Sequence, residues 1–353
     1  MKAPQHLRYL WQRGCNFLGV EHAILGGAMT WVSDYNLVAA ISNAGGFGVL
    51  ACGAMSCDLL SEEIEKTYAK TSKPFGVNLI TLHPDLLKLA QVCIDHKIQH
   101  VVLAGGLPPK EAIELLKAGG VKVICFAPAL ALAKKLIRSG VDALVIEGNE
   151  AGGHIGPVST SVLAQEILPH ITEIPVFVAG GIGRGEAIVN YLEMGAAGCQ
   201  LGTRFVCAHE SRAHPQFKQA FIRAAARNAV VSPQLDARFP VIPVRALANS
   251  GTEEFIQFQR DMIQQVDSGK LMLDQAQLNI EHYWAGALRR AVMDGDVEKG
   301  SLMAGQSVGM VEKEESIQDI IDTLISQATA YIEHKFNART GSAHTDESRT
   351  RAP

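Results

Sequence analysis

Residues 100–127 read HVVLAGGLPPKEAIELLKAGGVKVICFA, and this stretch decides the fold. It opens with an apolar run ending in glycine, HVVLAG (100–105), and closes with a second apolar run, KVICFA (122–127). Between them PKEAIELLKAGG (109–120) has helical spacing and ends in glycine, as a helix C-terminus prefers. Continuous apolar runs joined by a helix are typical of parallel strands that are buried on both faces.

The same unit recurs along the first 206 residues. Eight apolar runs alternate with helical segments, and the order shows no obvious reversal of the sheet. Eight such units favour an α/β fold of the (β/α)₈ TIM barrel type over the alternative, a doubly wound open sheet. The eight predicted strands are 23–29, 46–53, 75–80, 100–105, 122–127, 142–148, 175–181 and 198–205, and the clearest helices are 58–71, 84–97, 109–120, 129–140 and 184–195.

The chain after residue 206 has a different character, because helical patterns continue at 214–227, 252–267 and 273–293 without a new series of strands. We therefore expect the barrel to comprise residues 1–206 and 291–335, with a smaller helical substrate-binding insertion, or lid, at 207–290. The polar segment 336–353 is expected to be a disordered tail.

Composition narrows the function classes. The chain has 353 residues, 47% hydrophobic and 19% charged, with a net charge of −4. No dense basic stretch indicates nucleic-acid binding, and no run is long and apolar enough to predict a membrane span. The N-terminus lacks the pattern of a signal peptide, and seven dispersed cysteines suit reduced thiols, so we expect a cytoplasmic location. Cys52 and Cys57 are close together, but nothing nearby completes a metal site, and no metal is predicted.

Glycine-rich turns follow the seventh and eighth strands, where barrels frequently bind phosphate. Gly180 and Gly181 lie in AGGIGRGEA (179–187), while Gly202 and Thr203 lie in LGTR (201–204). Glycine lets backbone N–H groups approach phosphate oxygens, and the threonine adds a hydroxyl donor. These four residues predict a phosphate cup; the alternative is that the glycines only make tight turns.

The stretch EGNEAGGHIG (147–156) follows the sixth strand. Glu147 stands at the strand end, where a carboxylate can accept from the hydroxyls of a sugar-like chain. The small residues Ala151, Gly152 and Gly153 would let a flat ligand lie against the backbone and present His154 at its edge. Since flexible glycines add no stability to such a loop, we interpret His154 as catalytic rather than as a structural histidine.

Other strand ends supply further candidates. Gly27 and Met29 follow the first strand, and Asn78, at the end of the third, offers a donor and an acceptor to a heteroaromatic ring. Ser301 and Gln306, in GSLMAGQSVGMV (300–311), could reach a substrate or could belong to a plain connection. Cys207 and His209 are weaker candidates near the eighth strand.

These residues together resemble the superfamily of flavin-dependent nitronate monooxygenases and enoyl-acyl carrier protein reductase II. The resemblance covers about residues 20–325, through GGAMTWVSDYNLVAAISNAGGFGVL, KPFGVN, EGNEAGGHIG, VAGGIGRG, QLGTRFVCAHES and GSLMAGQSVGMV. It implies a barrel that binds FMN and His154 as the catalytic residue. It also implies that Asn78, Glu147 and Gly152 touch the flavin or its ribityl chain, with the phosphate held at Gly181 and at Gln200, Leu201, Gly202 and Thr203.

The segments GGAMTWVSD, AHESRAHP and GSLMAGQ are similar to the reductase branch. That branch implies NAD(P)H as co-substrate and an enoyl thioester, linked to a small molecule or to acyl carrier protein, with His154 as acid or base. A nitronate monooxygenase using oxygen is the alternative, and a non-catalytic barrel binding a phosphate ligand is a third. A carrier protein would need basic residues at the mouth, for which Arg204, Arg212, Arg238 and Arg245 are candidates. A homodimer is an assembly compatible with these readings.

Overall fold

The computed structural model describes residues 2–53, 55–236, 238 and 243–346. All eight predicted strands are present and pair in parallel in the order β1-β9-β8-β6-β5-β4-β3-β2. A bridge between Leu25 and Phe47 joins the first and last members, so the sheet closes into a ring. The (β/α)₈ barrel is therefore confirmed and the open sheet is excluded. The strands are β1 (Ile24–Gly26), β2 (Gly48–Ala51), β3 (Phe75–Ile80), β4 (His100–Ala104), β5 (Lys122–Phe126), β6 (Ala143–Glu147), β8 (Val176–Ala179) and β9 (Gly198–Leu201).

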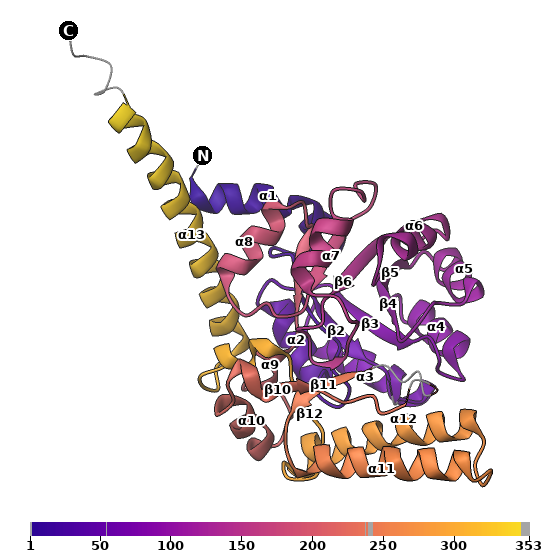
Figure 1. Ribbon diagram of the computed structural model, residues 1–353. Coiled ribbons are helices and arrows are strands. Elements are labelled where there is room, and N and C mark those ends of the chain that lie inside the picture. The colour runs from indigo at the N-terminus through magenta and orange to yellow at the C-terminus, as the bar shows by residue number, and fades with distance from the viewer. Residues whose placement is uncertain (1, 54, 237, 239–242, 347–353) are drawn as a thin grey trace.

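Helices surround this ring, as Figure 1 shows. Local sequence starts several of them: the Asp34 carboxylate accepts from the N–H groups of Asn36 and Leu37, and the Ser56 hydroxyl from that of Leu59. Such caps satisfy donors that the first helical turn leaves unpaired. The outer helices are α2 (Tyr35–Asn43), α3 (Cys57–Lys70), α4 (Leu86–Asp95), α5 (Lys110–Ala118), α6 (Leu130–Arg138), α7 (Thr160–Ile167), α8 (Gly185–Glu193) and α13 (Ile317–Asp346).

The floor of the barrel, at the N-terminal ends of the strands, is covered by α1 (Ala3–Leu18). Trp11 is only 2% exposed there. Phe17 and Phe47 pack edge-on against His100, the first residue of β4, with ring centroids 5.2 and 5.1 Å away. The floor is thus closed by aromatic packing.

The opposite end carries a lid, which we define as the described residues within 229–289. Its helices α11 (Ser250–Asp267) and α12 (Leu273–Arg289) lie as an antiparallel pair beneath the barrel in Figure 1. They pack around a second, smaller core formed by Val244, Phe255, Met262, Ala276 and Ile280. The remaining elements of this end are β7 (Gly153–His154), α9 (Thr203–Val206), α10 (Pro215–Ile222), the 3₁₀ turns η1 (Ala226–Asn228) and η3 (Gln306–Met310), β10 (Ala229–Val231), β11 (Val244–Leu247), the π-helical turn η2 (Arg290–Asp294) and β12 (Leu302–Met303).

The insertion differs from the expectation of a purely helical segment at 207–290. Strands β10, β11, β12 and β7 form a small antiparallel sheet. Each has two to four residues, which is too short for a periodic pattern to predict. In addition, Phe217 and Phe221 of α10 belong to the barrel core, so this helix packs with the barrel rather than with the smaller core of the insertion.

The C-terminal end of the ordered chain also differs from the expectation. We expected a disordered tail from residue 336, but α13 continues through residues 336–346, and residues 347–353 lie outside the described part. Extending a helix that is already formed avoids the cost of nucleating a new one. Figure 1 shows α13 passing α8 and α1 and projecting beyond the barrel.

In the described ranges, no helix combines the length and apolar character that crossing a membrane requires.

Candidate functional site

The loop between β6 and α7 begins after Glu147, the last residue of β6. Surrounding protein atoms desolvate the Glu147 carboxyl group and raise its pKa to about 8. Among the described residues the Glu147 carboxyl has no hydrogen-bond or ion-pair partner. At neutral pH the side chain is therefore largely a neutral acid that can both donate to and accept from a ligand.

Close packing explains two glycines of this loop. A Cβ at Gly148 would stand 2.0 Å from the Thr160 hydroxyl, and one at Gly152 would stand 2.5 Å from the Gly305 nitrogen. Both distances are shorter than any real contact, so these positions require glycine for backbone approach within the protein. The expectation that the loop glycines add no stability is therefore wrong for these two positions.

Glu150 fixes the middle of the loop. Its carboxylate accepts from the Thr160 N–H at 2.9 Å and from the Thr160 hydroxyl at 2.8 Å. The same hydroxyl lies 3.1 Å from the carbonyl oxygen of Gly180. Glu150 and Thr160 thus connect the loop after β6 to the glycine turn after β8.

His154 lies on β7 and is exposed at the mouth. It pairs in antiparallel register with Val244 of the lid strand β11, while Gly153 pairs with Arg245. The Ile155 N–H donates to the carbonyl of Pro243 at 2.9 Å. The histidine is therefore held by the lid as well as by the barrel.

Two glycines of the predicted phosphate cup adopt a backbone conformation that favours glycine. Gly180 and Gly181 adopt φ values of 97° and 70°, a left-handed region that side chains rarely occupy. A Cβ at Gly202 would meet only the Met29 side chain, at 3.5 Å, so the space in front of it is open. The Thr203 oxygen accepts from the Gly305 N–H at 3.0 Å, which leaves the hydroxyl hydrogen available to a phosphate oxygen.

The candidates on β1 and β9 come together at the same end. The Gly27 N–H donates to the Leu201 carbonyl at 2.8 Å, and a Cβ on Gly27 would stand 3.3 Å from the Gln200 amide nitrogen. Asn78, only 6% exposed, donates to the Val102 carbonyl at 3.3 Å. Gln200 and Ala151 are also buried.

Residues 301–306 form a strap across the mouth. Its Gly305 bonds Thr203, and its Gln306 N–H donates to the Glu150 carbonyl at 2.8 Å, so the strap links the loops after β6 and β9. Ser301 lies farther along, where its N–H donates to Ala287 of α12. The buried Ser301 hydroxyl has no partner among the described residues.

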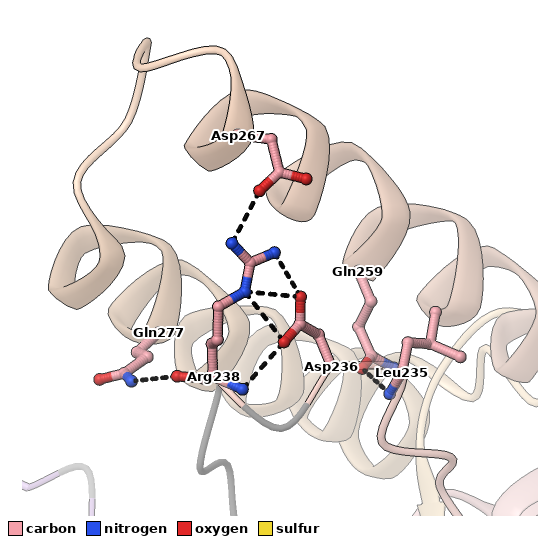
Figure 2. A network of polar contacts seen from close by, with 6 residues as sticks. All are labelled: Leu235, Asp236, Arg238, Gln259, Asp267 and Gln277. Carbon is pink, nitrogen blue, oxygen red and sulfur yellow. Dashed lines mark hydrogen bonds and ion pairs between the residues drawn. The ribbon is translucent and has the colours of Figure 1, made fainter.

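The four arginines proposed for a basic patch do not form one. Arg204 and Arg245 are 7% and 6% exposed. Figure 2 shows Arg238 held between Asp236 and Asp267 within the lid, with an Nη1 to Oδ1 distance of 2.7 Å to Asp267. Arg212 lies 3.9 Å from the Asp34 carboxylate. Sequence alone could not show that the charges were already paired or enclosed.

Two weaker candidates lie apart from the loop of His154. Cys207 is buried, and desolvation raises the pKa of its thiol to about 12, so it is an unreactive packing residue at neutral pH. His209 lines a cleft of about 580 Å³ between α2 and residues 209–212. In the described part of the chain, no group of three or more His, Cys, Asp or Glu is arranged to hold a metal ion.

Sequence reasoning missed Glu150, Thr160 and Gly305 as supports of this site, and it named Arg245 only as a candidate for a basic patch. Glu150 lies inside the stretch that the sequence singled out, and Thr160 opens the next helix. Their mutual bond depends on the path of the loop, which no sequence spacing reports.

Comparison with known proteins identifies the family of this chain. Residues 12–327 match the family model described as nitronate monooxygenase. A curated relative from Mycobacterium tuberculosis, (3aS,4S,5R,7aS)-5-hydroxy-7a-methyl-1-oxo-octahydro-1H-indene-4-carboxyl-CoA dehydrogenase, is 30% identical and covers 90% of this chain and 95% of its own. A nitronate monooxygenase from Paraburkholderia phytofirmans is 31% identical over 67% of this chain and 76% of its own.

Among solved structures, FabK from Thermotoga maritima superposes with a TM-score of 0.82 at 35% identity, covering 92% of this chain and 98% of that one. The relatives are enzymes of oxidation and reduction, so the third possibility, a non-catalytic binding barrel, is set aside. Together with the barrel and its site loops, these matches show that the chain is an oxidoreductase that belongs to the nitronate monooxygenase family.

Proposed function

We propose that this protein is an FMN-dependent oxidoreductase that transfers hydride between NAD(P)H and an enoyl thioester. The observation that carries the proposal is the pairing of His154 with the lid strand β11. A lid joined directly to the acid or base suits a long acyl thioester threaded between lid and barrel. The CoA thioester in the name of the Mycobacterium tuberculosis relative, which spans most of both chains, supports the same substrate class.

The residues present fit FMN. At the predicted cup, Gly202 faces open space and Thr203 has a free hydroxyl hydrogen for the phosphate, while Gly180 and Gly181 turn the backbone tightly against Thr160 and Glu150. Glu147, with no partner among the described residues, would bind hydroxyls of the ribityl chain. Gln200, Leu201, Gly27, Met29 and Asn78 would line the flavin from β9, β1 and β3, and Ala151, Gly152 and Gly153 from the loop after β6. Bound FMN supplies reversible hydride transfer.

The protein supplies position and a proton. His154 would donate a proton or hydrogen bond to the enolate that develops as hydride reaches the β-carbon of the thioester. Gln306 on the strap would orient the acyl chain, whereas the hydroxyl of Ser301, the other strap candidate, is buried. The product is the saturated thioester, and the nicotinamide is oxidised.

A nitronate monooxygenase is the second candidate, because the Paraburkholderia phytofirmans relative bears that name at similar identity. In that reaction the nitronate reduces the flavin and oxygen reoxidises it, with no nicotinamide.

Anaerobic mixing of the FMN-loaded protein with single reactants separates the two candidates. We expect NADH or NADPH to bleach the flavin and crotonyl-CoA to restore its colour. A flavin that stays yellow with both nicotinamides, yet bleaches with a nitronate, would refute the reductase in favour of the monooxygenase.

A further inference from the structure

Arg245 of the lid strand β11 contacts the His154 loop at both of its ends. Its Nε donates to the carbonyl oxygen of Asn149 at 2.7 Å, where the loop begins. Its backbone pairs with Gly153, and the preceding Val244 pairs with His154, where the loop ends. One lid residue therefore closes residues 149–153 into a fixed turn.

The same guanidinium is anchored on the lid side. Its Nη1 donates to the Ala229 carbonyl of β10 at 2.5 Å, so the loop, β11 and β10 meet at one side chain. Arg245 is only 6% exposed, and its guanidinium donates to carbonyl oxygens, while the Glu150 carboxylate acts on its charge only through space. Enclosing a charge on these terms is costly, and an apolar residue would fill the space without that cost. Unlike an apolar residue, arginine has a rigid, forked guanidinium that donates hydrogen bonds in two fixed directions.

The barrel side of the loop has hydrogen bonds of its own. Glu150 bonds Thr160, and its carbonyl bonds Gln306, and neither contact involves the lid strand. The loop therefore has a barrel anchor at Glu150 and a lid anchor at Arg245. His154 lies at the lid-anchored end.

We propose that Arg245 is a positioning residue that sets the place of His154 and couples it to the lid. The inference rests on the proposed role of His154 in the reaction. Arg245 does not meet the reacting atoms in this scheme; it acts through the histidine alone, while the phosphate cup on β8 and β9 is independent of it.

The test compares Arg245→Met and Arg245→Lys with the control Arg238→Met in the full FMN-loaded protein. Arg238 is also a lid arginine, but it bonds Asp236 and Asp267 inside the lid. We expect Arg245→Met to lower kcat about 10- to 100-fold, as loss of alignment does, with little change in FMN affinity. Arg245→Lys should recover part of the loss, and Arg238→Met should leave kcat unchanged.

Two further readouts separate positioning from general destabilisation. Backbone hydrogen exchange at residues 149–155 should accelerate in Arg245→Met but not in Arg238→Met. In a double-mutant cycle, Arg245→Met should cause no further loss of kcat once His154→Ala is present, because both changes remove the same function.

Equal exchange in all variants, or fully additive losses of kcat, would overturn the role of Arg245. If His154→Ala leaves turnover unchanged, the proposed function fails instead, and the exchange of residues 149–155 alone then decides whether Arg245 holds the loop. Should Arg245→Met not fold, Arg245→Lys carries the same comparison.

Discussion

The two ends of the barrel each enclose a titratable side chain, and they treat it in opposite ways. At the floor, burial lowers the pKa of His100 to about 4, and its Nε2 bonds the Phe17 carbonyl at 2.9 Å between two aromatic rings. At the mouth, burial raises the pKa of Glu147 to about 8, and its carboxyl has no partner among the described residues. Both groups are mainly neutral at pH 7, but only the floor group is packed as part of the core.

This difference separates stability from function within one fold. A titratable group that is desolvated, closely packed and hydrogen-bonded, like His100, is a fixed part of the structure. Desolvation without a partner, at an open end, yields a group whose hydrogen bonds a ligand must complete. Substitutions at the mouth should therefore reduce turnover with little effect on stability, and substitutions at the floor should do the reverse.

The largest effect is expected at the mouth from His154→Ala. If His154 supplies the proton, turnover should fall by about 10²- to 10⁴-fold, the usual contribution of a general acid or base. Because the side chain is exposed at the mouth, the urea midpoint should change little. Steady-state kinetics with crotonyl-CoA measure the turnover, and a urea denaturation curve measures the stability. A His154→Ala variant that keeps full turnover would contradict a catalytic role for the mouth of the barrel.

Glu147→Gln tests the unpaired carboxyl through pH. The folded protein keeps the Glu147 proton up to about pH 8, whereas the unfolded chain releases it near 4.5. Stability from this group is therefore present below pH 4.5 and is lost as pH rises toward 8. The FMN-free wild type should lose stability relative to Glu147→Gln over this interval, measured as urea midpoints. Parallel pH profiles for the two proteins would show that the carboxyl is not held neutral.

The two ends also differ in what the sequence could predict. Each strand at the core of the barrel is a continuous apolar run, so all eight were found. The sequence indicated a role for the loop glycines, and for Gly148 and Gly152 the physical reason that the structure gives is packing against Thr160 and Gly305. The short lid strands and the bond of Arg245 to Asn149 join segments far apart in the chain, and no local pattern encodes such contacts.

His100→Ala should give the opposite result to the mouth variants. Removing the ring leaves a cavity between Phe17 and Phe47, at a cost of about 2–4 kcal/mol in the free energy of unfolding. Wild-type stability from His100 is present above pH 6.5 and is lost as pH falls toward 4, a slope that the variant should lack. Urea titrations across that range measure both effects. The kcat of the folded variant should match wild type, and a large drop would contradict a purely structural floor.

The smallest expected effect concerns single hydroxyl groups at the two ends. Thr203→Val keeps the side-chain shape but removes both the hydrogen proposed for the FMN phosphate and the acceptor of the Gly305 N–H, so FMN affinity should fall about tenfold, equivalent to about 1.4 kcal/mol. Its control is Ser42→Ala at the floor, where the hydroxyl donates to the Pro74 carbonyl at 2.9 Å. That change should cost about 1 kcal/mol of stability and leave FMN affinity unchanged. Fluorescence titration of the apoprotein with FMN measures the affinities. Equal affinities in Thr203→Val and wild type would place the phosphate elsewhere, whereas a loss in both variants would attribute it to general loosening of the barrel.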